Sequence, residues 1–166
     1  MSELDMRLKQ LDKLEKKIQL QEDIREIEKL TYDYVDYLVT VQWDNLVECF
    51  TEDAKIEIGV AGLRKGKKEI TKLFKEEIGT RHIGKEMVFI VHPKITVDGN
   101  KAKGNWFLYF QFTEATHIET FKWVQGPYDI SYEKINGQWK ISCLKWEQRL
   151  GPVPKKLLQI YGKKDD

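Results

Sequence analysis

Two hairpin signals in the second half of the chain place the strongest constraint on its fold. Asp98-Gly99 separates the runs EMVFIVHPKITV and KAKGNWFLYFQF, and Asn136-Gly137 separates IETFKWVQGPYDISYEKI from QWKISCLKWEQ. Asp-Gly and Asn-Gly favour tight two-residue turns, and the flanking runs are rich in the β-branched and aromatic residues that strands prefer. The pattern therefore predicts two β-hairpins, joined through TEATH into a four-strand antiparallel meander.

The first half of the chain predicts three helices and a single strand. Residues 1–40 carry apolar side chains at helical spacing without an intervening Gly or Pro, and WDNLVECF indicates a second, short helix. The run AKIEIGV alternates as a strand does, GLRKG is predicted as a turn, and KKEITKLFKEEIG predicts an amphipathic helix that ends at Gly79. The predicted class is therefore α+β, with the order α-α-β-α-β-β-β-β.

The N-terminal helix carries an apolar pattern of its own. Leu4, Leu11 and Ile18 recur every seven residues, which is the spacing of a helix-packing seam. After Gln21 the apolar phase shifts, so the sequence predicts either a break there or one long helix that changes its packing partners. The seam itself is predicted either to face a partner subunit or to dock on its own domain.

Composition and charge narrow the class of protein. A chain of 166 residues suits one folded domain, and a net charge of +1 gives no broad attraction to nucleic acid or to acidic membranes. No apolar run approaches the ~20 residues of a membrane helix, and the charged N-terminus lacks the apolar core of a secretion signal. Cys49 and Cys143 are therefore predicted to be free thiols in a cytoplasmic protein. The scattered histidines and cysteines match no metal-ligand spacing and no cofactor motif is present, so neither a metal nor a cofactor is predicted.

Six short motifs, taken in order, carry a family resemblance. They are DIREIEKL…Y (23–34), Trp43-x2-Leu46, FTEDA (50–54), KGKKEI (65–70), ITVDGNKAKGNWFL (95–108) and YEKINGQWKIS (132–142). Together they resemble the SnoaL-like branch of the nuclear-transport-factor-like superfamily, and within it the bile acid 7-alpha dehydratase and scytalone dehydratase group.

The resemblance implies a fold, a ligand class and an assembly. The expected fold is a cone-shaped, curved mixed sheet (a cystatin-like α+β barrel) wrapped by N-terminal helices around a pocket for a hydrophobic small molecule. Assembly into a homo-oligomer, a dimer or a trimer, is expected. The chain then divides into an N-terminal helical extension (1–20), the SnoaL-like domain (21–150) and a C-terminal tail (151–166) that could lie across an opening.

The resemblance also implies where catalytic residues would lie. Dehydratases of this group use a tyrosine on the first long helix, an aspartate about a turn later, a histidine on the strand after the third helix and a polar or acidic residue on the next strand. Tyr34 matches the tyrosine. The aspartate position falls on Val39, the histidine position on Val88 and the acidic position on Phe110, so all three are apolar here. The predicted pocket lining also includes Ile58, Trp106, Trp146 and Gln148.

Two polar residues near Val88 offer a relocated acid–base set. Residues two apart in a strand share a face, so Glu86 and His92 are predicted on the face of Val88, where either could work with Tyr34. Each also has a structural interpretation. Tyr34 could be a half-buried core tyrosine, Glu86 a solvated residue at the start of a strand, and His92, just before Pro93, a side chain that points outward. The sequence leaves these alternatives open.

Two functions from different classes follow. The first is a cofactor-free lyase or isomerase, dehydratase-like, that acts on a hydrophobic polycyclic or aromatic compound. The second is a non-catalytic protein that binds an apolar ligand, or forms an oligomer or assembly, and has lost the dehydratase residues. The family resemblance favours the first function, whereas the apolar replacements favour the second.

Overall fold

A long helix packs against a strongly curved sheet in this protein. The computed structural model describes residues 2–80, 84, 86–114 and 117–149. The predicted C-terminal tail, and residues 115–116 of the turn predicted at TEATH, lie outside the described residues. The helical segments are α1 (Glu3–Val39), α2 (Trp43–Glu48), the 3-10 helix η1 (Gly59–Ala61), α3 (Lys67–Lys72) and the π-helical η2 (Leu73–Ile78). The strands are β1 (Phe50–Ile58), β2 (Gly62–Lys65), β3 (Met87–Asp98), β4 (Lys101–Glu114), β5 (His117–Ile135) and β6 (Gln138–Trp146).

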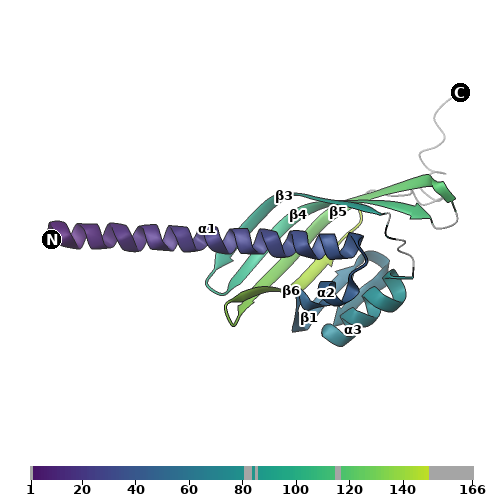
Figure 1. Ribbon diagram of the computed structural model, residues 1–166, viewed down its shortest axis with the longest axis horizontal. Coiled ribbons are helices and arrows are strands. Elements are labelled where there is room, and N and C mark those ends of the chain that lie inside the picture. The colour runs from purple at the N-terminus through teal and green to yellow at the C-terminus, as the bar shows by residue number, and fades with distance from the viewer. Residues whose placement is uncertain (1, 81–83, 85, 115–116, 150–166) are drawn as a thin grey trace, which may run out of the picture.

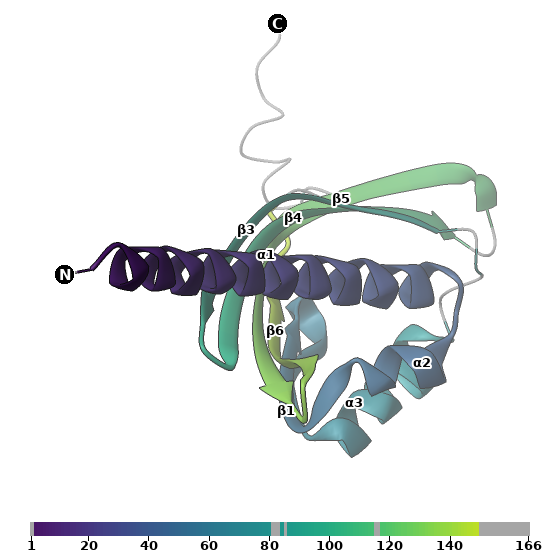
Figure 2. The same cartoon turned by 60° about the vertical axis from the view of Figure 1, so that its left-hand side comes forward.

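The six strands form one mixed sheet in the order β2-β1-β6-β5-β4-β3. The predicted meander is confirmed, because β3, β4, β5 and β6 pair in sequence and each is antiparallel to the next. β1 pairs parallel to β6 and antiparallel to β2, which makes the sheet mixed. Figure 2 shows the sheet curving around α1, with α2 and α3 on the side of β1. The predicted α+β class, a curved mixed sheet wrapped by N-terminal helices, is confirmed.

The two hairpin turns differ in backbone conformation. The loop of the first hairpin is Gly99-Asn100, one residue later than the Asp98-Gly99 signal, and only Gly99 has a positive φ, of 56°. This is typical of a type II′ turn, which favours glycine at its first position. The second loop is Asn136-Gly137, with φ of 51° and 80°, as a type I′ turn requires. Both turns suit the right-handed twist of the strands that they join.

The segment GLRKG, which the sequence predicts as a turn, is instead a short edge strand. β2 pairs antiparallel with the second half of β1. Gly62 and Gly66 have φ of 73° and 81°, a left-handed conformation that glycine adopts without steric cost. The chain can therefore turn sharply at both ends of this strand. The strand brings Arg64 to the Glu77 side chain of η2.

α1 is one uninterrupted helix with two different halves. Its buried residues all lie in the second half: Asp23, Ile27, Thr31, Tyr34, Val35 and Leu38. In its first half the seam residues Leu4, Leu11 and Ile18 are 66%, 55% and 58% exposed, and Figure 1 shows this half projecting beyond the sheet. The seam therefore does not dock on the described part of its own domain. Despite the length of α1, no helix in the described part of the chain is long and apolar enough to cross a membrane.

β4 shows how the sheet separates an inner from an outer face. Ala102, Trp106, Leu108 and Phe110 are buried. Phe107 and Tyr109, which alternate with the last three, are exposed. On β3, β4 and β5, five of the exposed apolar side chains that the structure describes on the outer face form what we call the outer aromatic patch: Met87, Phe89, Phe107, Tyr109 and Trp123. The inner face supplies one wall of the core, and α1 supplies the opposite wall.

Candidate functional site

A cavity of about 410 Å³ lies between the inner face of the sheet and the helices. Its walls come from α1, from the β1–η1–β2 segment, from η2 and from the inner faces of β4, β5 and β6. Most of the lining side chains are apolar. The lining residues are Tyr34, Leu38, Ile58, Gly59, Ala61, Arg64, Leu73, Phe74, Glu77, Ile78, Leu108, Phe110, Tyr128, Trp146 and Gln148. A volume above about 300 Å³ is within the usual range for small-molecule sites.

A pair of tyrosines supplies hydroxyl groups to this cavity. The hydroxyl oxygens of Tyr34, on α1, and Tyr128, on β5, are 2.7 Å apart, and both residues are almost completely buried. Phe50 and Phe74 pack edge-on against the Tyr34 ring, with centroids 5.7 and 6.3 Å away. These contacts fix the ring and leave the hydroxyl at the cavity.

Burial sets the protonation state of both hydroxyls. It raises the pKa of Tyr34, although the hydrogen bond with Tyr128 acts in the opposite direction. Burial raises the pKa of Tyr128 well above its ordinary value, and the neighbouring Tyr34 adds to the effect. Both groups are therefore neutral near pH 7, so they can donate and accept hydrogen bonds but cannot serve as bases.

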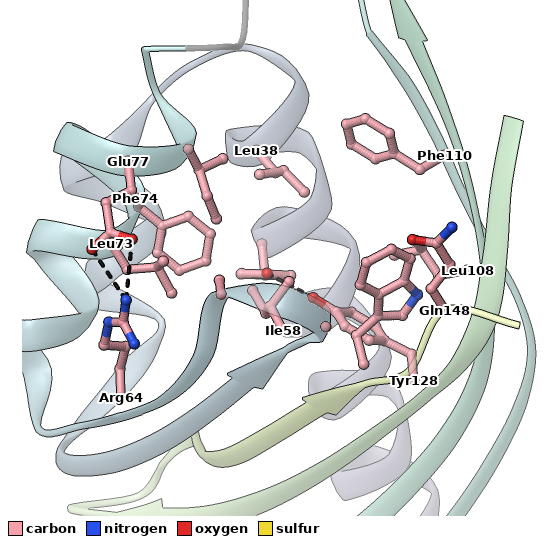
Figure 3. Close-up of a pocket in the computed structure, with 15 residues that line it drawn as sticks. Leu38, Ile58, Arg64, Leu73, Phe74, Glu77, Leu108, Phe110, Tyr128 and Gln148 are labelled. Carbon is pink, nitrogen blue, oxygen red and sulfur yellow. Dashed lines mark hydrogen bonds and ion pairs between the residues drawn. The ribbon is translucent and has the colours of Figure 1, made fainter. Parts of the chain in front are cut away.

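An ion pair lies on another wall of the cavity. Nη2 of Arg64 contacts Oε2 of Glu77 at 3.1 Å and Oε1 at 3.2 Å. Figure 3 shows this pair on the side of the cavity away from Tyr128 and Gln148. The side chains are 25% and 42% exposed, so the pair stands at an open part of the wall. The cavity thus has a neutral hydroxyl pair in one region and a charged pair in another.

Trp146 contributes one more polar atom. Its indole Nε1 is buried, and within the described part of the chain this donor has no hydrogen-bond partner. Leaving a buried donor unpaired costs about 1–3 kcal/mol, so an acceptor at this position would be favourable. Among the described residues, no group of three or more His, Cys, Asp or Glu side chains is arranged to hold a metal ion.

Five of the residues predicted for the site lie on the cavity wall: Tyr34, Ile58, Phe110, Trp146 and Gln148. Three others lie elsewhere. Val39 and Val88 are partly buried against the core, and Val88 lies opposite Phe110 in the β3–β4 ladder. Trp106 is buried farther along β4, where its Nε1 donates to the Tyr132 hydroxyl at 3.2 Å. Ligand contact by the wall residues stays a prediction.

The two candidate bases are not on the described wall. Glu86 is buried just before β3 begins. His92 has a φ of 56° at an irregularity in the β3–β4 register between Val91 and Lys94. This break interrupts the strand alternation, and the His92 ring lies edge-on to Phe107 of the outer aromatic patch, 6.0 Å away. His92 therefore lies on the face of the sheet opposite the cavity, as its outward alternative predicts.

Sequence reasoning missed the polar partners of the site. A count across the Asn136-Gly137 hairpin places Lys145 opposite Tyr128, but a register shift between Ser131 and Tyr132 places Trp146 there. The sequence places Tyr128 on a strand as an aromatic residue, but it does not show on which face of the sheet the side chain lies. Arg64 and Glu77 carry no such signal, because their contact depends on the edge strand β2, which reads as a turn.

Comparisons with known proteins identify a family match and several solved structures of similar fold. A model of the SnoaL-like domain matches residues 19–145, which confirms the resemblance carried by the six motifs. Similar solved structures include a candidate scytalone dehydratase from Novosphingobium aromaticivorans, 20% identical, covering 81% of this chain and 89% of that chain with a TM-score of 0.73. A hexachlorocyclohexane dehydrochlorinase from Novosphingobium barchaimii is 17% identical over 81% of this chain and 92% of that chain, with a TM-score of 0.73.

A third similar structure is an NTF2-like protein with a cystatin-like fold from Novosphingobium aromaticivorans. It is 18% identical, covers 89% of this chain and 96% of that chain, and has a TM-score of 0.75. No curated protein matches the sequence. At identities this low, the likeness to solved structures establishes the fold alone.

Proposed function

Because the chain belongs to the SnoaL-like domain family, we propose that it binds a hydrophobic small molecule in the cavity between α1 and the sheet. The observation that carries the proposal is the apolar cavity of about 410 Å³ with the Tyr34–Tyr128 hydroxyl pair in its wall. Apolar walls with a few placed polar groups are typical of small-molecule sites. The walls would hold an aromatic or polycyclic body, and the hydroxyls would orient one oxygen of the ligand.

Fluorescence of N-phenyl-1-naphthylamine, a neutral apolar dye, tests this function. The dye should bind saturably to the wild-type protein. Ile58→Trp adds a large side chain to the cavity wall and should weaken binding by at least about tenfold, since bulk there excludes the ligand. Phe107→Ser is the matched control, because Phe107 is 47% exposed on the outer aromatic patch. Dye binding that is lost in Phe107→Ser and kept in Ile58→Trp would refute the cavity as the binding site.

A second function, a cofactor-free lyase or isomerase, is favoured by the position of Tyr34 at the cavity. The family resemblance assigns a catalytic tyrosine there, and the similar structures include a candidate scytalone dehydratase and a dehydrochlorinase. Dehydration of a β-hydroxy ketone removes a proton beside the carbonyl and expels the hydroxyl group as water. Tyr34, kept neutral by burial, would hydrogen-bond the carbonyl oxygen.

The second function also requires a base, and the described cavity wall does not supply either base that the sequence predicts. Glu86 and His92 are the candidates from the sequence, but neither lines the described cavity, and His92 lies on the outer face. Glu77 is the one carboxylate on the described wall and would be the nearest alternative. Binding therefore stands ahead of catalysis as the proposed function.

An assay with 3-hydroxy-1-tetralone separates the two functions. Loss of water from this compound yields 1-naphthol, which is fluorescent. A lyase should accelerate its formation, and Tyr34→Phe should lower turnover by roughly 10²–10⁴-fold without unfolding the protein. If the dye binds but no acceleration over buffer is seen with this or related β-hydroxy ketones, the binding function remains. An active enzyme with an unchanged Tyr34→Phe rate would remove Tyr34 from the mechanism.

We further propose that the protein is a homo-oligomer, a dimer or a trimer, and that residues 1–20 form an extension that reaches a second copy. Leu4, Leu11 and Ile18 face solvent in the single chain, and pairing two such seams would bury them. Deleting residues 1–17 should lower the number of subunits measured by light scattering. An unaltered number would remove the extension from the interface.

Location in the cytoplasm is proposed as well, since both Cys49 and Cys143 are free thiols.

A further inference from the structure

Arg64 is a cation with unused hydrogen-bonding capacity on an apolar wall. Both short contacts to Glu77 come from one atom, Nη2. Among the described residues, its only other hydrogen bond is a long one of 3.4 Å from Nη1 to the Leu63 carbonyl. A guanidinium group carries five N–H donors in a planar fork, so at least two of them, on Nε and Nη1, remain available among the described contacts.

Glu77 is suited to giving up its place beside Arg64. Its side chain is 42% exposed, and ion pairs of this kind contribute only about 0–1 kcal/mol. Displacement of Glu77 into solvent therefore costs little. A ligand carboxylate or sulfonate could then meet the guanidinium through two parallel N–H···O bonds, which the present contact does not make.

The apolar walls beside Arg64 favour an anion that is part of a larger apolar ligand. Between the Arg64 region and the Tyr34–Tyr128 region the lining is formed by apolar residues such as Leu73 and Phe74. A small inorganic anion would leave these walls in contact with water. A molecule with a ring body and one acidic group would cover the walls and pair with the cation at once.

We propose that Arg64 is a specificity-determining residue that selects aromatic or polycyclic acids over neutral compounds of the same shape. The carboxylate or sulfonate of the ligand takes the place of Glu77, and the ring body fills the cavity toward Tyr34 and Tyr128. This inference rests on the proposed binding function and names the ligand class of the same site. Arg64 positions the ligand through charge and fork geometry, and Glu77 occupies the fork when no ligand is bound.

Two dyes that differ by a single acidic group test the inference. N-phenyl-1-naphthylamine is neutral, and 8-anilinonaphthalene-1-sulfonate has the same ring body with a sulfonate. Arg64→Gln should weaken binding of the sulfonate by at least about tenfold, as expected for the loss of charge-assisted hydrogen bonds, and leave the neutral dye within about twofold. Glu77→Gln removes the competing charge and should tighten the sulfonate alone. Arg64→Lys keeps the charge without the fork and should fall between wild type and Arg64→Gln.

Lys67→Gln is the matched control for net charge. Lys67 is a partly buried cation that pairs with Glu48 and Glu52, and it does not line the cavity. Its substitution should leave both dyes unaffected. Equal weakening of the two dyes by Arg64→Gln, or weakening of the sulfonate by Lys67→Gln as strong as by Arg64→Gln, would overturn the inference while the binding function stands. If neither dye binds the wild-type protein, or if Ile58→Trp has no effect on either, the proposed function fails and the inference fails with it.

Discussion

Two buried tyrosine hydroxyls on the same interface between α1 and β5 have different surroundings. The Tyr132 hydroxyl is 2.7 Å from the Thr31 hydroxyl and accepts the indole N–H of Trp106 at 3.2 Å. Thr31 donates its own proton to a main-chain carbonyl one turn earlier, so Tyr132 donates to Thr31 and accepts from Trp106. The Tyr34 hydroxyl, less than a turn after Thr31, pairs only with the Tyr128 hydroxyl within the described part of the chain.

The difference shows that equal burial does not imply equal hydrogen-bonding capacity. Tyr132 uses both its donor and its acceptor capacity inside the protein, and such closed networks make a core rigid. In the Tyr34–Tyr128 pair one O–H donates to the other oxygen, which leaves one hydroxyl proton for a further acceptor. We call the Tyr132 side the closed half of the core and the Tyr34 side the cavity half. The first has a structural role, and the second can serve a ligand.

The largest effect should come from adding one methyl group to the closed half. A Cβ at Gly104 would lie 2.7 Å from Nε1 of Trp106 and 3.2 Å from the Tyr132 hydroxyl. Gly104→Ala must therefore displace the buried Trp106–Tyr132 contact, and overpacking of this kind costs about 1–3 kcal/mol. Chemical denaturation should show a lower midpoint with an unchanged slope.

The cavity half provides the control for this substitution. Ala61 lines the cavity, so Ala61→Val adds methyl groups next to open space and should change the unfolding free energy by no more than about 0.5 kcal/mol. A cost for Ala61→Val as large as that for Gly104→Ala would show that the cavity half is packed as tightly as the closed half. The distinction between the two halves would then be lost.

Removal of each hydroxyl should lower the unfolding free energy by a smaller amount, and by different amounts for Tyr132 and Tyr34. Tyr132→Phe leaves the buried Trp106 N–H without its acceptor and should cost about 1–2 kcal/mol. Tyr34→Phe leaves Tyr128 with a hydroxyl that still faces the cavity, where water can bond it, so the cost should be about 0.5 kcal/mol. Urea melts of the two variants, run in parallel, measure the difference. Equal costs would mean that the Tyr34 pair is as structural as the Tyr132 network.

Much of this fold was predictable because its signals are local. The turns at Asn136-Gly137 and near Asp98-Gly99 depend on backbone preferences of the loop residues themselves, and the meander follows from them. The edge strand β2 was not predictable, because its four residues become a strand only by pairing with β1. The first half of α1 has a clear helical pattern, but the pattern alone did not decide whether Leu4 and its neighbours were covered.

The candidate site was predictable only where it inherits positions from the family. Tyr34, Ile58 and Phe110 could be placed by counting along motifs, and all three line the cavity. His92 could not, because a register irregularity in β3 reverses the alternation on which its placement depended. The Arg64–Glu77 contact needs two elements whose meeting is a property of the tertiary structure, so no local pattern indicates it.

A pH-dependent effect is expected at Asp23, which extends the closed half to an earlier turn of α1. Its carboxylate accepts bonds from Lys134 at 2.7 Å and from Nε1 of Trp139 at 3.0 Å. Burial tends to raise the pKa of Asp23, but the hydrogen bonds from Lys134 and Trp139 and the charge of Lys134 outweigh it, so the pKa is lowered. A lowered folded-state pKa contributes stability that is present above the unfolded value of about 4 and is lost as the pH falls through the folded value.

Asp23→Asn should therefore cost about 1 kcal/mol at pH 7, and the gap from wild type should shrink as the pH falls below about 4. Asp12→Asn is the control, because Asp12 forms an exposed pair with Lys16 on the projecting half of α1. That variant should stay within about 0.5 kcal/mol of wild type throughout. Unfolding free energies measured between pH 3 and 7 give both curves. A gap for Asp23→Asn that does not change over this range would show that the charge of Asp23 does not stabilise the closed half, and that its contacts act through packing alone.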